Sequence, residues 1–160
     1  YGGTWIDSTV YLTEPLPDTI LNSDFFAVRN SLLLIDNPVL YPAWFLHAKK
    51  GNKTIREVRN VAFSYWLKNE HVIEYLLPNL IITLVVKSNP KVEKAIPYMN
   101  SDYSEYLVKV LADDYSEEKW NWIKKLTGIH KLTYKLDADI KHGHNFYDYL
   151  ITSSDEKNTK

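Results

Sequence analysis

The chain begins with a segment in which aromatic and β-branched residues alternate with polar ones. Residues 5–12 read Trp-Ile-Asp-Ser-Thr-Val-Tyr-Leu, a composition typical of a β-strand. Because successive side chains of a strand point to opposite faces, Asp7 and Thr9 are predicted to share one face. The same kind of composition predicts two further strands, over residues 25–29 and 43–48.

After the third predicted strand the apolar positions recur with the period of a helix. Thr54 and Glu57 have the spacing of a capping box, in which each side chain bonds a free backbone N–H of the first turn. The apolar run 72–86 predicts a buried helix that is broken at Pro78, because the residue before a proline avoids helical geometry. Periodicity alone leaves 80–86 open between helix and strand.

The last third of the chain predicts two helices, a strand and a tail. One helix is expected to open at Asp102 and the next at Ser116, with Gly128 ending the second. Alternation then returns over residues 131–136, which predicts a half-buried strand with lysines on its outer face. Residues 152–160 are polar and have no apolar period, so they are predicted to form a disordered tail.

Composition limits the possible functions. The 160 residues are 45% hydrophobic and 24% charged, as in a globular domain of ordinary size. Nineteen basic and 20 acidic residues leave a net charge of -1, which argues against a general nucleic-acid binder. The absence of cysteine excludes disulfides, thiolate metal sites and cysteine nucleophiles. No apolar run in this sequence is long enough to predict a transmembrane segment.

Two groups of polar residues could bind a metal ion. Oxygen ligands such as those of Asp7 and Thr9 suit hard cations, of which Mg²⁺ and Mn²⁺ can bridge a pyrophosphate. The alternative is that both residues simply line a solvated strand edge. His142 and His144 lie close together on a predicted loop, but without an evident third ligand they indicate a solvated loop.

The first ten residues carry a resemblance to a known family. The run from Tyr1 through the Gly-Gly pair to Asp7 and Val10 resembles the metal-binding signature of GT-A glycosyltransferases of the capsular polysaccharide synthesis group. Similar segments follow in the family's order. They are Trp44-Phe45, Lys50-Gly51-Asn52, Ile73-Glu74-Tyr75-Leu76 and the run from Ile129 to Lys135.

The resemblance implies an α/β, GT-A-like fold. Residues 1–151 would form the C-terminal part of the domain, ahead of the tail 152–160. The nucleoside-binding units of this fold come before the metal motif, so they are expected to precede Tyr1, and the chain is expected to be part of a longer one.

The resemblance also implies a site. Asp7 and Thr9, joined by His130, would hold Mn²⁺ or Mg²⁺ on the donor's diphosphate. Lys131 or Lys135 would bind the phosphates, and Glu74 would orient an acceptor hydroxyl or brace the donor sugar. A second interpretation of His130 is a hydrogen-bonded core histidine, because alternation places it with the apolar residues.

The implied function is sugar transfer from a nucleotide-diphosphate donor to a bacterial surface polysaccharide or related glycan. Donor and acceptor would be the partners, in the cytoplasm or peripherally at the inner face of the membrane. The alternative is a non-catalytic domain that binds a glycan or a partner protein. Thr9, in the position of the motif's second aspartate, favours this alternative because a hydroxyl is a weaker ligand than a carboxylate.

Overall fold

The chain folds into two compact units. The structure is a computed structural model that describes residues 1–31, 36–136, 140 and 143–157. Unit 1 comprises residues 1–8 and 16–101, and unit 2 comprises residues 9–15 and 102–160. The chain therefore passes between the units three times, and the first passage falls between Asp7 and Thr9.

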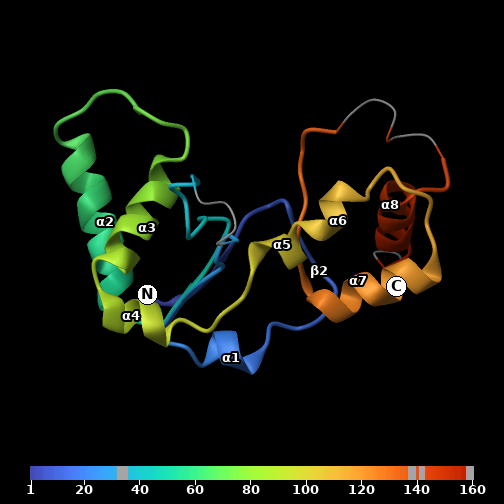
Figure 1. Ribbon diagram of the computed structural model, residues 1–160, viewed down its shortest axis with the longest axis horizontal. Helices are drawn as coiled ribbons and strands as arrows, with labels where there is room; N and C mark the ends of the chain where they lie inside the picture. Colours follow the sequence, from blue (N-terminus) through green and yellow to red (C-terminus); the bar gives the residue numbers. More distant parts are fainter. Residues whose placement is uncertain (32–35, 137–139, 141–142, 158–160) are drawn as a thin grey trace. The chain divides into compact units, whose positions relative to one another are not determined.

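Unit 1 is built on a three-stranded antiparallel sheet, formed by blue and cyan segments of the chain in Figure 1. The strands are β1 (Gly3–Ile6), β3 (Phe25–Ala27) and β4 (Phe45–Ala48), in the order β1-β4-β3. The central strand β4 places Ala48 opposite Gly3 on one side and opposite Phe25 on the other. The predicted strands 25–29 and 43–48 are thus confirmed as β3 and β4.

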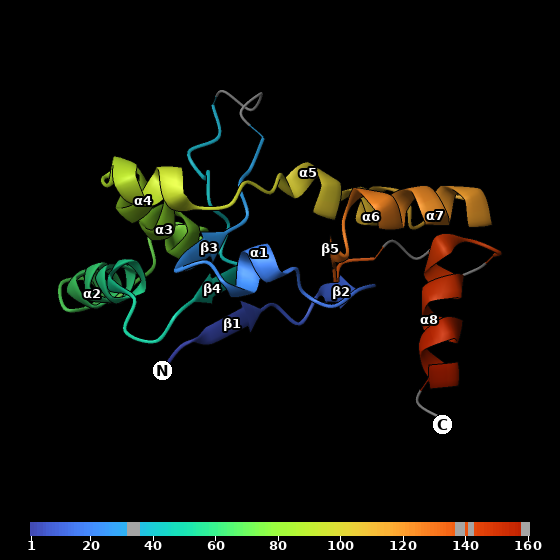
Figure 2. The ribbon, with the colours of Figure 1, turned by 90° about the horizontal axis from the view of Figure 1, so that it is seen from below.

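Helices cover one face of this sheet. Figure 2 shows α2, α3 and α4, whose bounds follow, on the same side of the strands. The helices of unit 1 are α1 (Asp18–Leu21), α2 (Lys53–Trp66), α3 (Leu77–Lys87) and α4 (Pro90–Ala95). Ile82 and Val86 of α3 share a buried cluster with Phe25 and Ala27 of β3. Burial of these apolar side chains is the main stabilising contribution to unit 1.

Polar side chains of α3 fix the segment that leads into β4. The Thr83 hydroxyl accepts hydrogen bonds from the backbone N–H groups of Leu40 and Tyr41, both at 3.1 Å. One turn earlier, Asn79 Oδ1 accepts from the Ala43 N–H at 2.8 Å. These bonds satisfy backbone donors that no strand partner reaches, which a part-buried segment requires.

We expect Thr83→Val to destabilise the protein by about 1–3 kcal/mol, because two donors lose their acceptor while the side-chain shape is kept. Thr83→Ser retains the hydroxyl and is the matched control, expected to lose less. Chemical denaturation followed by circular dichroism measures both. Equal stability of the valine variant and the wild type would contradict the assigned role.

In its described residues, unit 2 contains a two-stranded antiparallel sheet and four helices. The strands β2 (Val10–Leu12) and β5 (Ile129–Lys131) pair with Tyr11 opposite His130. The helices are α5 (Ser101–Ser104), α6 (Tyr106–Lys109), α7 (Glu117–Leu126) and α8 (Phe146–Lys157). The core is formed by Leu107, Ile123 and Phe146, all completely buried. The first residue of α5, Ser101, belongs to unit 1.

The single strand predicted over residues 5–12 is wrong. It is two strands, because β1 pairs with β4 whereas β2 pairs with β5. Residues 7–9 form the junction between them: Asp7 follows β1, and Thr9 lies in a turn before β2. The two side chains therefore do not share a strand face.

Other boundaries also differ from the prediction. Asn52 caps α2 by accepting from the Ile55 N–H at 3.0 Å, so Thr54 and Glu57 do not form the cap. Pro78 lies in the first turn of α3, where its missing N–H costs nothing, and starts that helix instead of breaking one. Residues 80–86 are helical, and 72–76 form a connection.

In unit 2 the cap of α7 is confirmed, since Ser116 Oγ accepts from the Lys119 N–H at 3.2 Å. The helix predicted from Asp102 is instead the short pair α5 and α6. The strand predicted over 131–136 is wrong, because β5 ends at Lys131. The tail predicted from Thr152 is corrected in part: α8 continues to Lys157, and residues 158–160 lie outside the described residues.

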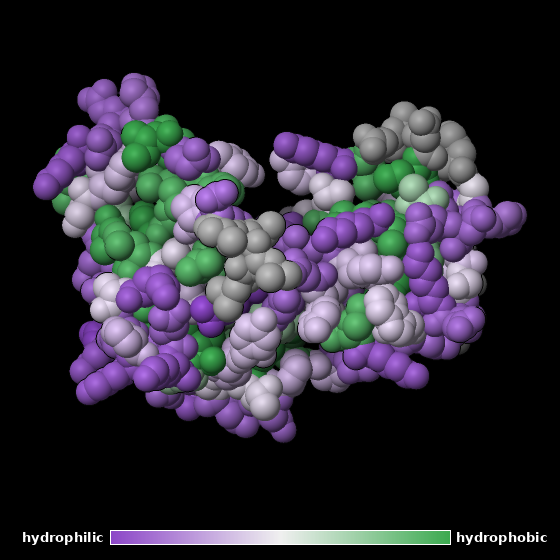
Figure 3. Space-filling model, viewed as in Figure 1, coloured by the Kyte–Doolittle hydropathy of each residue, from purple (hydrophilic) through white to green (hydrophobic). Residues whose placement is uncertain are grey.

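Several large apolar side chains remain exposed, and many of them belong to unit 1. Figure 3 shows hydrophobic residues in green among the purple charged ones over the helices α2 and α3. Trp66 at the end of α2 and Leu84 on α3 are examples. The sequence pattern predicts Trp66 as a core residue, and the structure corrects this.

Candidate functional site

The Asp-Ser-Thr junction is held by backbone bonds on both sides. The Asp7 N–H donates to the Trp44 carbonyl at 2.9 Å, which extends the β1–β4 pairing. The Thr9 carbonyl accepts from the Leu132 N–H at 2.8 Å, which extends the β2–β5 pairing. Both side chains are half-buried. Asp7 thus belongs to unit 1 and Thr9 to unit 2.

Thr9 is in direct contact with Lys131. The Lys131 ammonium donates a hydrogen bond to the Thr9 hydroxyl and another, at 3.0 Å, to the Leu132 carbonyl. The two residues are 122 positions apart, and pairing of β2 with β5 brings them together. Of the residues predicted for the site, this pair is therefore joined by the fold. A half-buried, oriented ammonium is a group that can stabilise negative charge.

Glu105, between α5 and α6, is an acidic residue that interacts electrostatically with this cation. Burial raises the pKa of its carboxyl, Asp102 raises it further, and the lysines 109 and 131 oppose the shift. Its side chain makes no capping bond to α6. Carboxyl groups with raised pKa values are often functional, since they can exchange protons near neutral pH. No sequence motif marks this residue, because the shift comes from burial.

His130 lies within the core of unit 2. It is completely buried, and its ring lies 6.4 Å from that of Tyr11 and 6.1 Å from that of Trp120, between centroids. Its Nε2 is 3.2 Å from the Thr13 hydroxyl, and its Nδ1 has no hydrogen-bond partner among the described residues. Burial lowers its pKa to about 4, so the ring is neutral at physiological pH.

These contacts allow a test of the predicted metal centre. The Thr9 hydroxyl accepts from the Lys131 ammonium, whose positive charge opposes a second cation on the same oxygen. His130 is enclosed by apolar rings. In the described ranges, no three His, Asp or Glu residues come close enough to hold a metal ion. Asp7, Thr9 and His130 stay predicted metal ligands, with Thr9 bonded to an ammonium and His130 within the core of unit 2.

The remaining predicted residues lie on other elements. Glu74 is exposed in the connection between α2 and α3, not on a helix, and its Oε1 accepts from the Leu76 N–H at 3.2 Å. Lys135 is exposed, with its ammonium 5.7 Å from the centroid of the Tyr134 ring. The functional roles of both stay predictions. His144 is exposed, and His142 lies outside the described residues.

Two of the family-like segments meet in unit 1. A Cβ atom on residue 2 would lie only 2.4 Å from the backbone nitrogen of Lys50, so only glycine fits at this position. A shallow depression of about 380 Å³ lies beside it, lined by the first five residues together with Ala48 and Ile55. The Trp5 indole N–H donates to the Ala43 carbonyl at 3.0 Å, which orients an exposed ring over this surface. Such rings can stack on the apolar face of a sugar.

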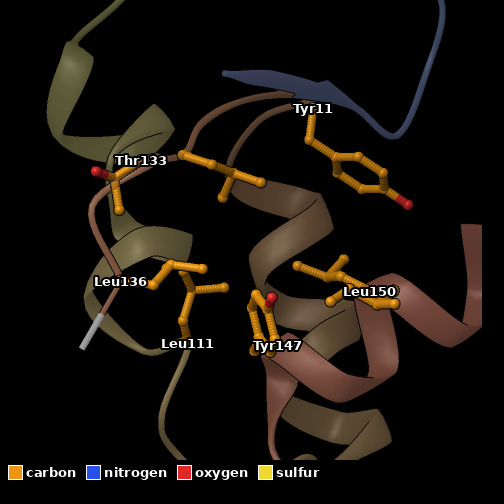
Figure 4. Close-up of a pocket in the computed structure, with 8 residues that line it drawn as sticks. Tyr11, Leu111, Thr133, Leu136, Tyr147 and Leu150 are labelled. Carbon is orange, nitrogen blue, oxygen red and sulfur yellow. The ribbon is translucent and has the colours of Figure 1, made fainter. Parts of the chain in front are cut away.

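Unit 2 has an apolar cavity of about 240 Å³ (Figure 4). Tyr11 of β2 lies on one side, and Leu111, Tyr147 and Leu150 lie across the cavity from it (Figure 4). Leu132, Thr133, Leu136 and Ile151 complete the lining. Walls of this composition suit an apolar group and do not suit a diphosphate.

The observations so far define the class of the protein. It is an α/β protein with two small antiparallel sheets, in which strand pairing places an ammonium group against the hydroxyl of an Asp-x-Thr segment. The chain belongs to the family of capsular polysaccharide synthesis proteins, whose family model matches residues 1–150. This confirms the resemblance seen in the sequence. No curated protein and no solved structure matches the chain.

Proposed function

We propose that this protein transfers a sugar from a nucleotide-diphosphate donor to a capsular polysaccharide or a related glycan. Membership of the capsular polysaccharide synthesis family supports a role in the synthesis of such a polysaccharide. The observation that carries the proposed chemistry is the Lys131 ammonium held against Thr9. We further propose a GT-A-like fold and a cytoplasmic location, both on the resemblance of the first ten residues to that group.

In the proposed reaction the bond between the anomeric carbon of the sugar and a diphosphate oxygen breaks. A hydroxyl oxygen of the acceptor takes its place on the carbon and loses its proton to a base. Negative charge develops on the leaving diphosphate, and the Lys131 ammonium stabilises it because hydrogen bonds already hold the group in place. Thr9 acts as a positioning residue for this ammonium.

The acceptor proton needs a base. The resemblance gives Glu74 the task of orienting the acceptor hydroxyl or bracing the donor sugar, and a carboxylate that orients the hydroxyl can also take its proton. Glu105 is a second candidate, because burial raises the pKa of its carboxyl and it interacts electrostatically with Lys131. A base whose pKa lies closer to the working pH is the more effective proton acceptor. Separate Glu74→Gln and Glu105→Gln variants distinguish the two, since only loss of the base removes the acidic limb of the pH–rate profile.

The proposal is tested by incubating the full-length protein with a panel of uridine, guanosine and cytidine diphosphate sugars and a polysaccharide acceptor. We expect acceptor-dependent release of nucleoside diphosphate from one donor, measured by a coupled enzyme assay. The predicted need for Mn²⁺ or Mg²⁺ is tested by adding chelator, and the predicted ligand by Asp7→Asn. Saturable binding of glycan without any nucleotide release would instead support the non-catalytic alternative.

A further inference from the structure

Apolar side chains are concentrated on the outside of the connection between α2 and α3. Leu67, Ile73 and Tyr75 are 85%, 76% and 82% exposed. We call the following exposed residues the apolar patch: Phe63, Trp66, Leu67, Val72, Ile73 and Tyr75. In Figure 3 green residues appear beside this connection, at the upper left. Exposed apolar groups gathered in this way mark an interaction surface.

The backbone that carries the apolar patch is held in place by hydrogen bonds. The Tyr65 hydroxyl donates to the His71 carbonyl at 2.6 Å and accepts from the Ile73 N–H at 3.1 Å. Asn69 Nδ2 donates to the Tyr65 carbonyl at 2.8 Å. The patch is therefore presented by a fixed connection, so little ordering entropy is lost when it binds.

Basic residues lie next to the apolar patch on the outer face of α2. Arg56 and Arg59 are exposed and precede Phe63 on that face, and the Arg59 guanidinium lies 5.9 Å from the centroid of the Phe63 ring. Helix α2 contains three basic residues and one acidic residue, whereas the connection 67–76 contains one basic and two acidic residues. The excess of positive charge thus lies on α2, next to Phe63 and Trp66.

Arginine together with Trp, Phe and Leu on one exposed surface is typical of helices that lie in a membrane interface. Tryptophan and tyrosine prefer this region because their rings have an apolar body and a polar edge. Arginines attract the phosphate groups of anionic lipids. No helix in the described part of the chain has the length and apolar character needed to cross a bilayer.

We propose that the α2–α3 edge of unit 1 docks onto the surface of an anionic phospholipid bilayer. The apolar patch enters the boundary between headgroups and acyl chains, and Arg56 and Arg59 contact lipid phosphates. Charge complementarity favours this occupant, because the basic residues flank the apolar ones on the same helix. The inference is independent of the proposed sugar transfer.

The test is flotation of the full chain with vesicles of phosphatidylglycerol and phosphatidylcholine in equal parts. We expect the wild type to float with these vesicles and to bind vesicles of phosphatidylcholine alone about tenfold more weakly, since the lipid charge is then lost. The double variant Leu67→Glu/Ile73→Glu should bind the anionic vesicles at least about tenfold more weakly. Arg56→Glu/Arg59→Glu should lose a similar factor. Leu21→Glu, at an exposed leucine of α1, is the matched control and should bind as the wild type does.

A second measurement locates the contact. Lipids brominated on their acyl chains should quench the fluorescence of Trp66, and Trp66→Phe should remove the quenched component. Three outcomes overturn the proposal: no flotation of the wild type, unchanged flotation of Leu67→Glu/Ile73→Glu, or no quenching. If light scattering shows that the apolar patch forms a dimer that this variant dissociates, without any lipid binding, the surface is an interface between copies and the proposal is wrong.

Discussion

Lys131→Met is expected to lower kcat/KM for sugar transfer by about 100- to 1,000-fold, the usual loss when one preorganised stabilising group is removed. The reason is that the Lys131 ammonium is already oriented by the Thr9 hydroxyl and the Leu132 carbonyl. Most of the loss should appear in kcat, because the charge on the leaving diphosphate develops only in the transition state. Steady-state kinetics of the full-length protein provide the measurement.

Three further variants make this result specific. Lys131→Arg keeps the charge and should recover part of the activity. Lys125→Met removes an exposed lysine near the end of α7 and should leave the rate unchanged. Thr9→Val keeps the cation but removes one of its hydrogen-bond partners, so we expect a smaller loss that is not additive with Lys131→Met. Activity of Lys131→Met within a few-fold of the wild type would rule out the assigned role.

The second large effect concerns His130 and pH. Its pKa in the folded protein is about 4, because burial disfavours the charged ring, whereas the ordinary pKa of a histidine is 6.5. Between these values the unfolded chain binds a proton that the folded protein does not. The contribution of His130 to stability is therefore largest above about pH 6.5 and is lost as the pH is lowered toward 4, by at most about 3 kcal/mol.

Replacing His130 with glutamine keeps a hydrogen-bonding group beside Thr13 but removes the titration. We expect the free energy of unfolding of His130→Gln to vary less between pH 6.5 and 4 than that of the wild type, as measured by urea denaturation at a series of pH values. His144→Gln, at an exposed position, should show the wild-type dependence. The same slope in all three proteins would mean that His130 is not the group that titrates.

Local signals allowed several elements to be predicted. The β3 and β4 segments are rich in aromatic residues and have clear ends. Ser116 caps α7 by accepting a hydrogen bond from the Lys119 N–H, three residues further on. A serine before a helical pattern is a local signal of such a cap. Such features depend on neighbours within a few positions, so a single sequence contains them. The same holds for the Gly-Gly start and the Asp-x-Thr segment, which carried the resemblance to the family.

The errors came from contacts between distant segments. Residues 5–12 have one continuous strand-like composition, yet their two halves pair with different partners. The sequence predicted Thr54 as the cap of α2, but Asn52, one residue before the helix, caps it in the structure. The burial of His130 and the raised pKa of Glu105 follow from tertiary packing. No sequence period or motif shows which side chains the fold will bury. The resemblance to the family therefore placed Thr9 and Lys131 in one site, but the hydrogen bond between them could not be predicted.

The pairing of β2 with β5 has a consequence for biosynthesis. Thr9 and Lys131 are separated by 122 positions, so β2 leaves the ribosome long before its partner strand has been made. Until then β2 is a strand with unpaired N–H and C=O groups, the kind of segment that other chains can bind. Long-range pairing of this kind is also slow to form. Chaperone occupancy of nascent chains should therefore persist until β5 emerges, and truncation before residue 129 should yield aggregation-prone protein.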